Sequence, residues 1–353
     1  MRRTRALRAA LTATALSTAL VALGSGAAHA SPHHAAKPMP ARVAAPYFEA
    51  WTGQSPAALA AESGNKYLTL AFLQTPAAGS CTADWNGDAT QPISPSSFGA
   101  DIATLQARGG NAIPSFGGYS ADTTGTELAD SCTDVDAIAG VYEKLVTTYG
   151  ISRIDLDIEA DSLADTAGID RRNQAIAKAE RWADRTGHPL QFSYTLPTTT
   201  KGLEANGLAV LQNAVAHHAR VDVVNIMTFD YYDGATHDMA ADTRTAADGL
   251  HTQLAALYPH KSPRELWGMV GVTEMPGIDD YGPEETFTTQ NAVEVERWAA
   301  ARGIDTLSFW ALQRDNGGCV GTGGSNSCSG TAQDTWQFSH TFARFARFAG
   351  LGR

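Results

Sequence analysis

The feature that most limits the possible fold is a regular alternation of short apolar strands with helical patterns. We predict eight strands, at 45–51, 67–73, 111–117, 151–159, 190–196, 221–230, 266–272 and 306–312. The helical patterns between them are clearest at 134–149, 168–187, 202–219, 242–258 and 285–302. This alternation favours a parallel sheet whose strands are joined by helical crossovers.

Eight such units favour a closed barrel over an open doubly wound sheet. The first strand is not followed by G-x-G-x-x-G, which disfavours the dinucleotide-binding form of the open sheet. The chain shows no boundary that would indicate a second folded domain. We therefore predict an α/β fold, a single-domain (β/α)8 TIM barrel over residues 44–350.

The N-terminal region predicts export. Residues 1–30 combine a basic start, an apolar run and an Ala28-His29-Ala30 ending, which is typical of a secretory signal peptide. A membrane anchor and a disordered basic leader are the alternatives. No later stretch is long and apolar enough to span a bilayer. We expect a disordered linker at 31–43 and a secreted, extracellular protein with no membrane partner.

The charge balance excludes one large class of partners. The 353-residue chain has 26 Lys and Arg against 37 Asp and Glu, a net charge of −11. Without residues 1–30, four Arg are lost and no acid, so 22 basic side chains face 37 acidic ones and the net charge is −15. An acidic protein is a poor candidate for binding nucleic acid or anionic membranes. We expect no nucleic-acid partner and a monomer.

Four cysteines, Cys81, Cys132, Cys319 and Cys328, fit an exported protein. An even number suggests two disulfides, for which three connectivities are possible. Cys319 and Cys328 are nine residues apart in a turn-rich loop and pair easily, which leaves Cys81 with Cys132. A zinc site is the weaker alternative, because the chain has no C-x-x-C and no matching His spacing. We expect no metal.

The fourth predicted strand carries the main chemical signal, the sequence Ile-Asp-Leu-Asp-Ile-Glu at 154–159. Because side chains alternate along a strand, Asp155, Asp157 and Glu159 share one face and the three apolar residues share the other. If the apolar face packs on the helices, the three carboxylates point into the barrel. An antiparallel strand with one solvated face is the alternative, and it fits poorly because parallel strands are covered on both sides.

Three like charges inside a barrel are costly to bury, so we expect some of them to be protonated at neutral pH. A carboxylic acid with a raised pKa beside another carboxylate suits cleavage of a glycosidic bond. Glu159 lies nearest the strand end and is the candidate acid. Asp157, one step deeper, can accept a hydrogen bond from substrate or from Glu159. Asp155, deeper still, can share a proton with Asp157.

The pattern Asp155-x-Asp157-x-Glu159 resembles the signature of family 18 glycoside hydrolases, the chitinases. Two further strand ends are similar to the family's S-x-G-G and M-x-[YF]-D segments, namely 115–118 (Ser-Phe-Gly-Gly) and 227–230 (Met-Thr-Phe-Asp). Trp310, at the end of the eighth strand, matches the tryptophan that floors the family's −1 sugar site. The resemblance extends over roughly residues 45–345.

The resemblance implies a substrate-assisted mechanism that needs no metal and no cofactor. Glu159 protonates the glycosidic oxygen, and the 2-acetamido carbonyl of the sugar attacks the anomeric carbon. Asp157 orients the acetamido N–H, and Asp155 holds a proton with Asp157. Glu159 then acts as base toward water, which gives retention of configuration. The implied partners are chitin or chitooligosaccharides.

This chain departs from the family pattern at two places. Ser152 and Arg153 replace the Asp-Gly that begins the full signature, for which we expect altered packing without loss of activity. Phe229 stands where the family often has a tyrosine whose hydroxyl bonds the acetamido oxygen. We leave open which nearby tyrosine replaces this hydroxyl, the candidates being Tyr231, Tyr232 and Tyr194. The residues expected to contact substrate are Trp310, Asp230, Tyr231, Met227, Tyr194 and Ser115.

Other aromatic and acidic residues at strand ends are open to two interpretations. Trp51, Trp85 and Tyr119 fall at or beyond predicted strand ends, where stacking on sugar rings and packing in the core are both possible. Three acids, Glu49, Glu274 and Asp315, also follow predicted strands, and we expect them in solvated loops.

We predict a secreted chitinase that cleaves β-1,4-linked N-acetylglucosamine polymers with retention. One alternative enzyme is an endo-β-N-acetylglucosaminidase acting on N-glycan cores through the same acetamido chemistry. A non-catalytic chitin-binding barrel is the alternative from another class, and the presence of Glu159 counts against it.

Overall fold

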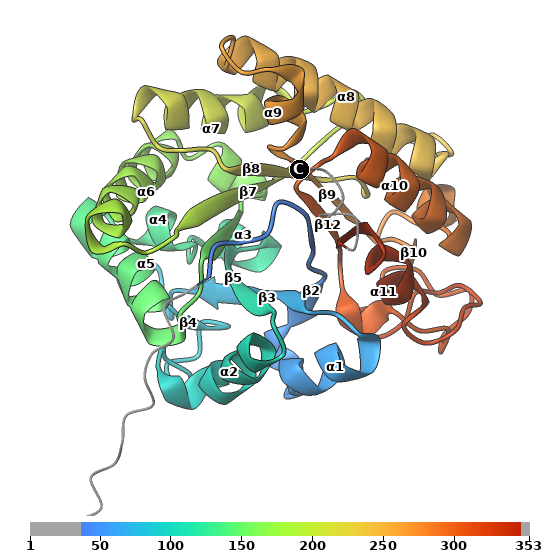
Figure 1. Cartoon of the computed structure of the whole chain (residues 1–353), viewed down its shortest axis with the longest axis horizontal. Helices are drawn as coiled ribbons and strands as arrows, with labels where there is room; N and C mark the ends of the chain where they lie inside the picture. The colour runs from blue at the N-terminus through green and yellow to red at the C-terminus, as the bar shows by residue number, and fades with distance from the viewer. Residues whose placement is uncertain (1–36, 347–353) are drawn as a thin grey trace, which may run out of the picture. The chain divides into compact units, whose positions relative to one another are not determined.

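The computed structural model describes residues 37–346 (Figure 1). The predicted signal peptide and residues 31–36 of the predicted linker lie outside the described residues. Val43 is buried and begins the first strand, so regular structure starts one residue before the predicted boundary at 44. In the described part of the chain, no helix combines the length and the apolar character that crossing a bilayer requires.

Each of the eight predicted segments overlaps a strand of the structure, and short strands are added. They are β1 (Val43–Ala44), β2 (Tyr47–Glu49), β3 (Tyr67–Gln74), β4 (Asp84–Trp85), β5 (Asn111–Gly117), β6 (Arg153–Asp157), β7 (Gln191–Pro197), β8 (Val223–Met227), β9 (Val270–Glu274), β10 (Gly277–Ile278), β11 (Thr286–Phe287) and β12 (Thr306–Phe309). β4 pairs antiparallel with β3, and β10 with β11 forms a separate two-stranded sheet.

The main sheet closes on itself through the first strand segment. β1 pairs in parallel with β12, and β2 pairs in parallel with β3. Pro46 lies between β1 and β2 and has no N–H to donate, so it divides the predicted first strand in two. The other strands follow in the order β12, β9, β8, β7, β6, β5 and β3. Because β1 and β2 are consecutive in the chain, this order completes a barrel, and the predicted fold is confirmed.

The helices surround the strands in Figure 1, as expected for crossovers between parallel strands. The α-helices are α1 (Pro56–Ser63), α2 (Ala100–Ala107), α3 (Tyr119–Thr124), α4 (Leu128–Ser131), α5 (Val135–Tyr149), α6 (Thr166–Thr186), α7 (Ala205–Ala216), α8 (Met239–Leu257), α9 (Pro263–Trp267), α10 (Thr289–Arg302) and α11 (Gln337–Phe342). A π-helix spans Pro95–Gly99, and short 3-10 helices span Ala50–Thr52, Ala160–Leu163, Pro283–Glu285 and Leu312–Arg314.

Local capping residues fix where the long helices begin and end. Asp134 accepts hydrogen bonds from the backbone N–H groups of Asp136 and Ala137 and so begins α5. Gly150 ends α5 with a φ of 64°, a left-handed conformation that glycine adopts without steric cost. Thr288 and Asn291 form a capping box at the start of α10, which is why this helix begins later than the predicted 285.

One predicted strand is partly wrong. The apolar run at 266–272 was expected to be extended, but Pro263–Trp267 forms α9 and the strand β9 begins at Val270. Ser262 and Glu265 form a capping box, and Pro263 occupies the first turn, so local helix-start signals prevail over the apolar character of the run.

The inner and outer faces of β6 follow the predicted alternation. Ile154, Leu156 and Ile158 are buried in the core between the sheet and the helices. The intervening carboxylates, Asp155 and Asp157, therefore point into the barrel. The inner face of β6 presents the carboxylates because its outer face packs against the helices.

The departure from the family signature at Arg153 has a structural counterpart. Its guanidinium is 1% exposed and lies 2.8 Å from Asp305 Oδ1, and it also donates to Gln191 Oε1 at 2.8 Å. Arg153 thereby links β6 with β7 and with the residue that precedes β12, at the barrel end opposite the carboxyl ends of the strands. The altered packing that we expected here is an ion pair.

Both disulfides connect the cysteines that sequence spacing favoured. Cys81 is bonded to Cys132, and Cys319 is bonded to Cys328. The first ties the segment after β3 to the end of α4. The second closes a loop between β12 and α11.

Candidate active site

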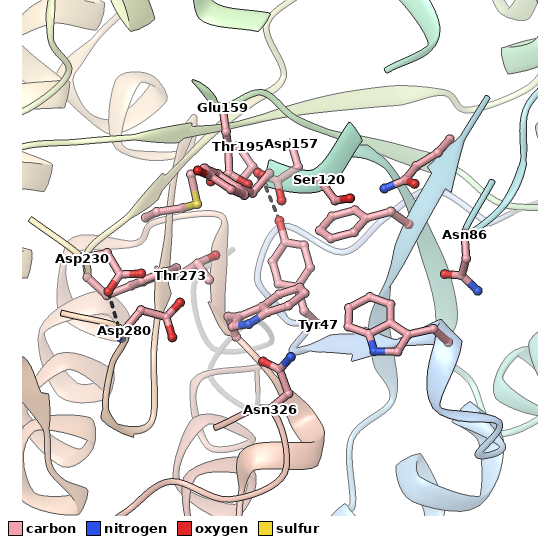
Figure 2. Close-up of a pocket in the computed structure, with 17 residues that line it drawn as sticks. Tyr47, Asn86, Ser120, Asp157, Glu159, Thr195, Asp230, Thr273, Asp280 and Asn326 are labelled. Carbon is pink, nitrogen blue, oxygen red and sulfur yellow. Dashed lines mark hydrogen bonds between the residues drawn. The ribbon is translucent and has the colours of Figure 1, made fainter. Parts of the chain in front are cut away.

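A pocket of about 450 Å³ opens at the carboxyl ends of the barrel strands (Figure 2). This volume lies in the range of small-molecule binding sites. Its lining residues come from several barrel strands and from the segments that follow them: Tyr47, Trp51, Phe72, Gln74, Asn86, Tyr119, Ser120, Asp157, Glu159, Thr195, Met227, Phe229, Asp230, Thr273, Asp280, Trp310 and Asn326. TIM-barrel enzymes place their chemistry at this end.

Asp155 lies beneath the pocket and is held by four hydroxyl donors. Tyr47 donates to Oδ2 at 2.9 Å and Ser115 at 2.7 Å. Ser193 donates to Oδ1 at 2.5 Å and Thr195 at 2.8 Å. Burial raises the pKa of Asp155, and the four hydroxyls oppose that rise because they stabilise the charged form. Asp155 therefore accepts more side-chain hydrogen bonds than Asp157 or Glu159 does.

Asp157 is one step nearer the opening and has a different environment. It is 4% exposed and lines the pocket, and its Oδ1 has no hydrogen-bond partner within the described residues. Burial raises the pKa of Asp157 well above its usual range, and the negative charges of Glu159 and Asp155 raise it further. Asp157 therefore holds a proton more readily than Asp155 and offers an unused acceptor to a ligand.

Glu159 is the second residue after β6 and lines the pocket. Burial raises the pKa of Glu159 to about 7, with smaller contributions from the charges of Asp230 and Asp280 and an opposing contribution from the backbone of Tyr119. A substantial fraction of Glu159 is therefore protonated at neutral pH, as a general acid requires.

Asp230 joins the pocket from the loop after β8. Its Oδ1 accepts the backbone N–H groups of Asp280 at 3.0 Å and Tyr281 at 3.2 Å, which ties this loop to the loop after β9. Burial raises the pKa of Asp230 to about 7, with the charge of Asp280 adding to the effect. In Figure 2, Asp230 and Asp280 lie together at one side of the pocket.

Carboxylate oxygens of Asp230, Asp279 and Glu285 lie within 4.8 Å of one another, a spacing that could hold a cation. Each of these carboxylates already accepts backbone N–H groups. Asp279 Oδ2 accepts from Asp230 at 3.0 Å, and Glu285 accepts from Tyr231 at 2.8 Å and Tyr232 at 3.1 Å. These bonds explain why the three carboxylates lie together, because they order the loop that carries Asp230.

Aromatic rings form a continuous surface in the pocket. Phe72 and Trp310 are stacked with centroids 5.6 Å apart, and Trp51 lies 6.4 Å from Phe72 and 6.1 Å from Trp310. Tyr47 lies 5.7 Å from Trp310 on the side of Asp155. Trp51 is 46% exposed, so its ring is open to a ligand. Aromatic faces beside carboxylates suit a sugar, which has apolar ring faces and polar edges.

Of the six residues expected to contact substrate, three line the pocket: Trp310, Asp230 and Met227. Ser115 lies deeper, fully buried, and its hydroxyl donates to Asp155. Tyr231 is not among the lining residues, and its buried hydroxyl has no partner within the described residues.

Tyr194 is a correction. It is fully buried on the helix-facing side of β7, and its hydroxyl donates to Asn173 Oδ1 of α6 at 2.9 Å. The alternation of β7 gives the physical reason, because Ser193 and Thr195 point inward to Asp155. Tyr232 is not among the lining residues either, so none of the three tyrosines that we considered lines the pocket with Phe229. The tyrosines that do line the pocket are Tyr47 and Tyr119.

The strand-end acids are a second correction. We expected Glu49, Glu274 and Asp315 in solvated loops, but all three are 0% exposed. Burial raises the pKa of Glu49 to about 7 and that of Glu274 to about 8. Trp85 is also fully buried, whereas Tyr119 is 68% exposed and lines the pocket.

Sequence reasoning missed Tyr47, Phe72, Asp280 and Asn326 as pocket residues. Tyr47 could have been found, because strand alternation places it on the inner face of the first strand. Phe72 lies where the register of β3 shifts, and Asp280 and Asn326 lie in loops, so no periodicity reports these three positions.

Residues 43–274 match the sequence profile of the glycosyl hydrolases family 18. The chain belongs to this family. Active domain 2 of the thermostable chitinase from Pyrococcus furiosus, solved in complex with chito-oligosaccharides, is 30% identical with a TM-score of 0.78, covering 92% of this chain and 100% of that one. The catalytic domain of the hyperthermophilic chitinase from Pyrococcus furiosus gives 30% identity and a TM-score of 0.77, covering 90% and 99%.

Two curated relatives of this family 18 member are longer proteins. The probable bifunctional chitinase/lysozyme of Escherichia coli (strain K12) is 31% identical over 324 residues, covering 88% of this chain and 35% of that protein. Endochitinase 11 of Metarhizium anisopliae is 30% identical over 291 residues, covering 79% and 53%. The chain thus spans about a third and about half of the lengths of these relatives.

Proposed function

We propose that this protein hydrolyses β-1,4 linkages between N-acetylglucosamine units of chitin and its oligomers, with retention at the anomeric carbon. The observation that supports this most directly is the position of Glu159. It lies at the open end of the row of carboxylates formed by Asp155, Asp157 and Glu159, in a pocket that Trp310 also lines. Its pKa of about 7 suits proton donation to a glycosidic oxygen near neutral pH. The chitinases among its relatives favour this substrate class.

In the proposed reaction the substrate supplies the nucleophile. Glu159 gives its proton to the glycosidic oxygen while the 2-acetamido oxygen bonds to the anomeric carbon and the leaving sugar departs. When substrate binds, Asp157 passes its proton to Asp155; it then accepts the acetamido N–H through the oxygen that has no protein partner, and its negative charge stabilises the oxazolinium that forms. Glu159 then removes a proton from water, whose oxygen attacks the anomeric carbon and reopens the ring. Glu159 thus acts in both steps, and Asp157 stabilises the intermediate between them.

Asp155, the deepest of the three carboxylates, supports Asp157. Asp155 is fixed by four hydroxyls from three strands, β2, β5 and β7, so it has little freedom to move. Its remaining role is electrostatic, since a second carboxylate below Asp157 favours a proton on Asp157 in the resting enzyme.

The decisive experiment compares three substrates. The protein is incubated with chitin oligomers, with a high-mannose glycopeptide and with a plain β-glucoside, and the products are analysed. We expect release from the chitin oligomers and none from the β-glucoside, because a β-glucoside has no acetamido group. Release from the glycopeptide alone would instead identify an endo-β-N-acetylglucosaminidase. Rapid cleavage of the β-glucoside would contradict the mechanism.

Substitution of the proposed acid tests the role of the pocket. Glu159→Gln keeps the side-chain size and removes the transferable proton, so turnover should fall by a factor of about 10²–10⁴ or more while the folded structure persists. The control is Glu62→Gln on the exposed surface of α1, which should leave turnover unchanged. Binding of chitin by Glu159→Gln without product release would separate binding from catalysis.

We also propose that the protein is exported. The two disulfides fit an oxidising compartment, where such bonds form and persist. Separation of culture medium from cells, followed by detection of the protein and thiol titration, tests this. Protein retained in the cell with four free thiols would contradict export.

A further inference from the structure

The loop Cys319–Cys328, closed by a disulfide after β12, reaches the pocket on the side away from Asp155, Asp157 and Glu159. Asn326, within the loop Cys319–Cys328, is one of the lining residues. In Figure 2, Asn326 lies across the pocket from Glu159, with Tyr47 between them. This loop lies outside the 43–274 segment that matches the family profile.

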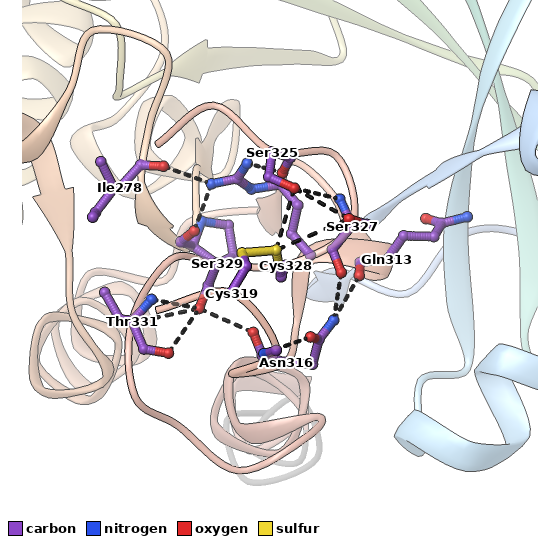
Figure 3. Close-up of a disulfide and its surroundings, with 12 residues drawn as sticks. Ile278, Gln313, Asn316, Cys319, Ser325, Ser327, Cys328, Ser329 and Thr331 are labelled. Carbon is purple, nitrogen blue, oxygen red and sulfur yellow. Dashed lines mark hydrogen bonds between the residues drawn. A yellow bond between two sulfur atoms is a disulfide. The ribbon is translucent and has the colours of Figure 1, made fainter. Parts of the chain in front are cut away.

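The backbone on both sides of Asn326 is held by two side chains from the segment after β12, those of Arg314 and Asn316 (Figure 3). Arg314, fully buried, donates to the carbonyl of Ser325 and, at 2.8 Å, to that of Ile278. Asn316 donates through its carboxamide to the carbonyl of Ser327 at 2.8 Å. The carbonyls immediately before and after Asn326 are thus both occupied, which holds the backbone that carries its side chain.

The loop also packs directly on an acid of the pocket. Gly324 has a φ of 61°, and a Cβ at this position would lie 2.5 Å from Asp280 Oδ1. Only a glycine allows the loop to approach Asp280 this closely. The disulfide between Cys319 and Cys328 closes the loop just beyond Asn326.

The side chain of Asn326 is exposed, while the loop's own hydrogen bonds are made by its neighbours. A carboxamide offers two donors and an acceptor, which match the hydroxyl and acetamido groups of a sugar. Trp51 and Trp310 line the same pocket, and their ring centroids are 6.1 Å apart. An aromatic surface wider than one ring, with an amide across the pocket from the acid, suits a ligand longer than the sugar being cleaved.

We propose that the loop Cys319–Cys328 forms a wall of the pocket and that Asn326 binds a sugar unit distal to the one that reacts at Glu159. This inference rests on the proposed function. Asn326 is then a residue that determines chain-length preference, and the disulfide with Arg314 holds it in place before substrate arrives. Such preorganisation reduces the entropy that binding must overcome.

The test measures kcat/KM on chitin oligomers from the dimer to the hexamer. Asn326→Ala should lower kcat/KM on the longest oligomers by roughly 3- to 10-fold, the loss of one neutral hydrogen bond. The shortest oligomer that the wild type cleaves should be unaffected. The control is Val320→Ala, a 66% exposed residue of the same loop that does not line the pocket, and it should change neither.

A second variant tests the disulfide. Cys319→Ser with Cys328→Ser should reproduce the length-dependent loss, and thermal unfolding checks that the barrel still folds. An equal loss at every length with Asn326→Ala, or no loss, would overturn the proposal. A wild-type protein that cleaves no oligomer at all would instead overturn the proposed function, so the two failures are distinguishable.

Discussion

The carboxylate of Asp122 accepts a hydrogen bond from the backbone N–H of Glu159, with its Oδ2 2.5 Å from that nitrogen. Asp122 belongs to α3, the helix after β5, and Glu159 is the second residue beyond β6. A side chain from the neighbouring βα loop therefore fixes the backbone at the point where the proposed acid leaves its strand. Asp122 is 2% exposed, and burial raises its pKa to about 9, with the charge of Glu127 adding to the effect.

This contact predicts different results for two substitutions of Asp122. Asp122→Asn keeps an acceptor for the Glu159 N–H and mimics the protonated acid, so kcat should stay within a few-fold of wild type. Asp122→Leu leaves a buried N–H unpaired, which costs about 1–3 kcal/mol, and should lower kcat by roughly 10-fold or more. KM should change little. Steady-state kinetics on a chitin oligomer gives both values, and equal losses in the two variants would show that the Asp122 charge is needed.

The pH dependence of activity should follow the ionisation of Glu159. Because Glu159 acts in its protonated form and burial raises its pKa to about 7, activity should fall as the pH rises through about 7. The negative charge of Asp280 contributes to this raised pKa. Asp280→Asn removes that charge, lowers the pKa of Glu159 and should move the alkaline limb to lower pH.

The control for charge removal is Asp184→Asn, an acid with a 68% exposed side chain in α6. It should leave the alkaline limb in place. Measurement of kcat/KM against pH for the three proteins decides the matter, and a limb that Asp280→Asn does not move would contradict this assignment.

Tyr47 should contribute to stability through its hydroxyl. Tyr47→Phe removes one of the four donors to Asp155 and should lower the free energy of unfolding by about 1 kcal/mol. Turnover should fall as well, since Asp155 supports Asp157. The matched control is Tyr142→Phe, because the buried hydroxyl of Tyr142 has no partner among the described residues and its removal should cost nothing. Denaturant unfolding and kinetics would measure both, and equal effects in the two variants would contradict the assigned contact.

Glu274 should make stability depend on pH. It is fully buried against α8, where Thr243 donates to its Oε1 at 2.8 Å, and burial raises its pKa to about 8. A carboxyl whose pKa is raised in the folded protein favours folding in its protonated form. Its contribution is complete below the unfolded pKa, near 4.5, and is lost as the pH rises toward 8.

Glu274→Gln removes this dependence. One pKa unit corresponds to about 1.4 kcal/mol, so a pKa raised from 4.5 to about 8 predicts that the variant gains roughly 4 kcal/mol relative to wild type between pH 5 and pH 9. Unfolding by denaturant at both pH values measures the difference. A wild type equally stable at the two pH values, with no relative gain in the variant, would show that Glu274 is not buried as a neutral acid.

The sequence by itself determined the features that depend on local periodicity. The inward direction of Asp155 and Asp157 follows from the two-residue period of β6 and from the apolar residues between them. The same reasoning failed for Tyr194, because its place at a strand end suggested the pocket while the alternation of β7 turns it toward α6. The two disulfides also followed from sequence spacing.

Tertiary structure alone decided which residues from other parts of the chain lie near Asp155, Asp157 and Glu159. Asp280 and Asn326 reach the pocket from loops after different strands, while Asp122 of α3 bonds the backbone of Glu159, and nothing in their local sequence marks these residues. Their positions depend on the closure of the barrel, which brings the carboxyl ends of strands far apart in the chain to one rim. The burial of Glu274 likewise depends on α8 covering it. Periodicity reports the direction of a side chain along its own strand, whereas long-range packing decides what that side chain meets.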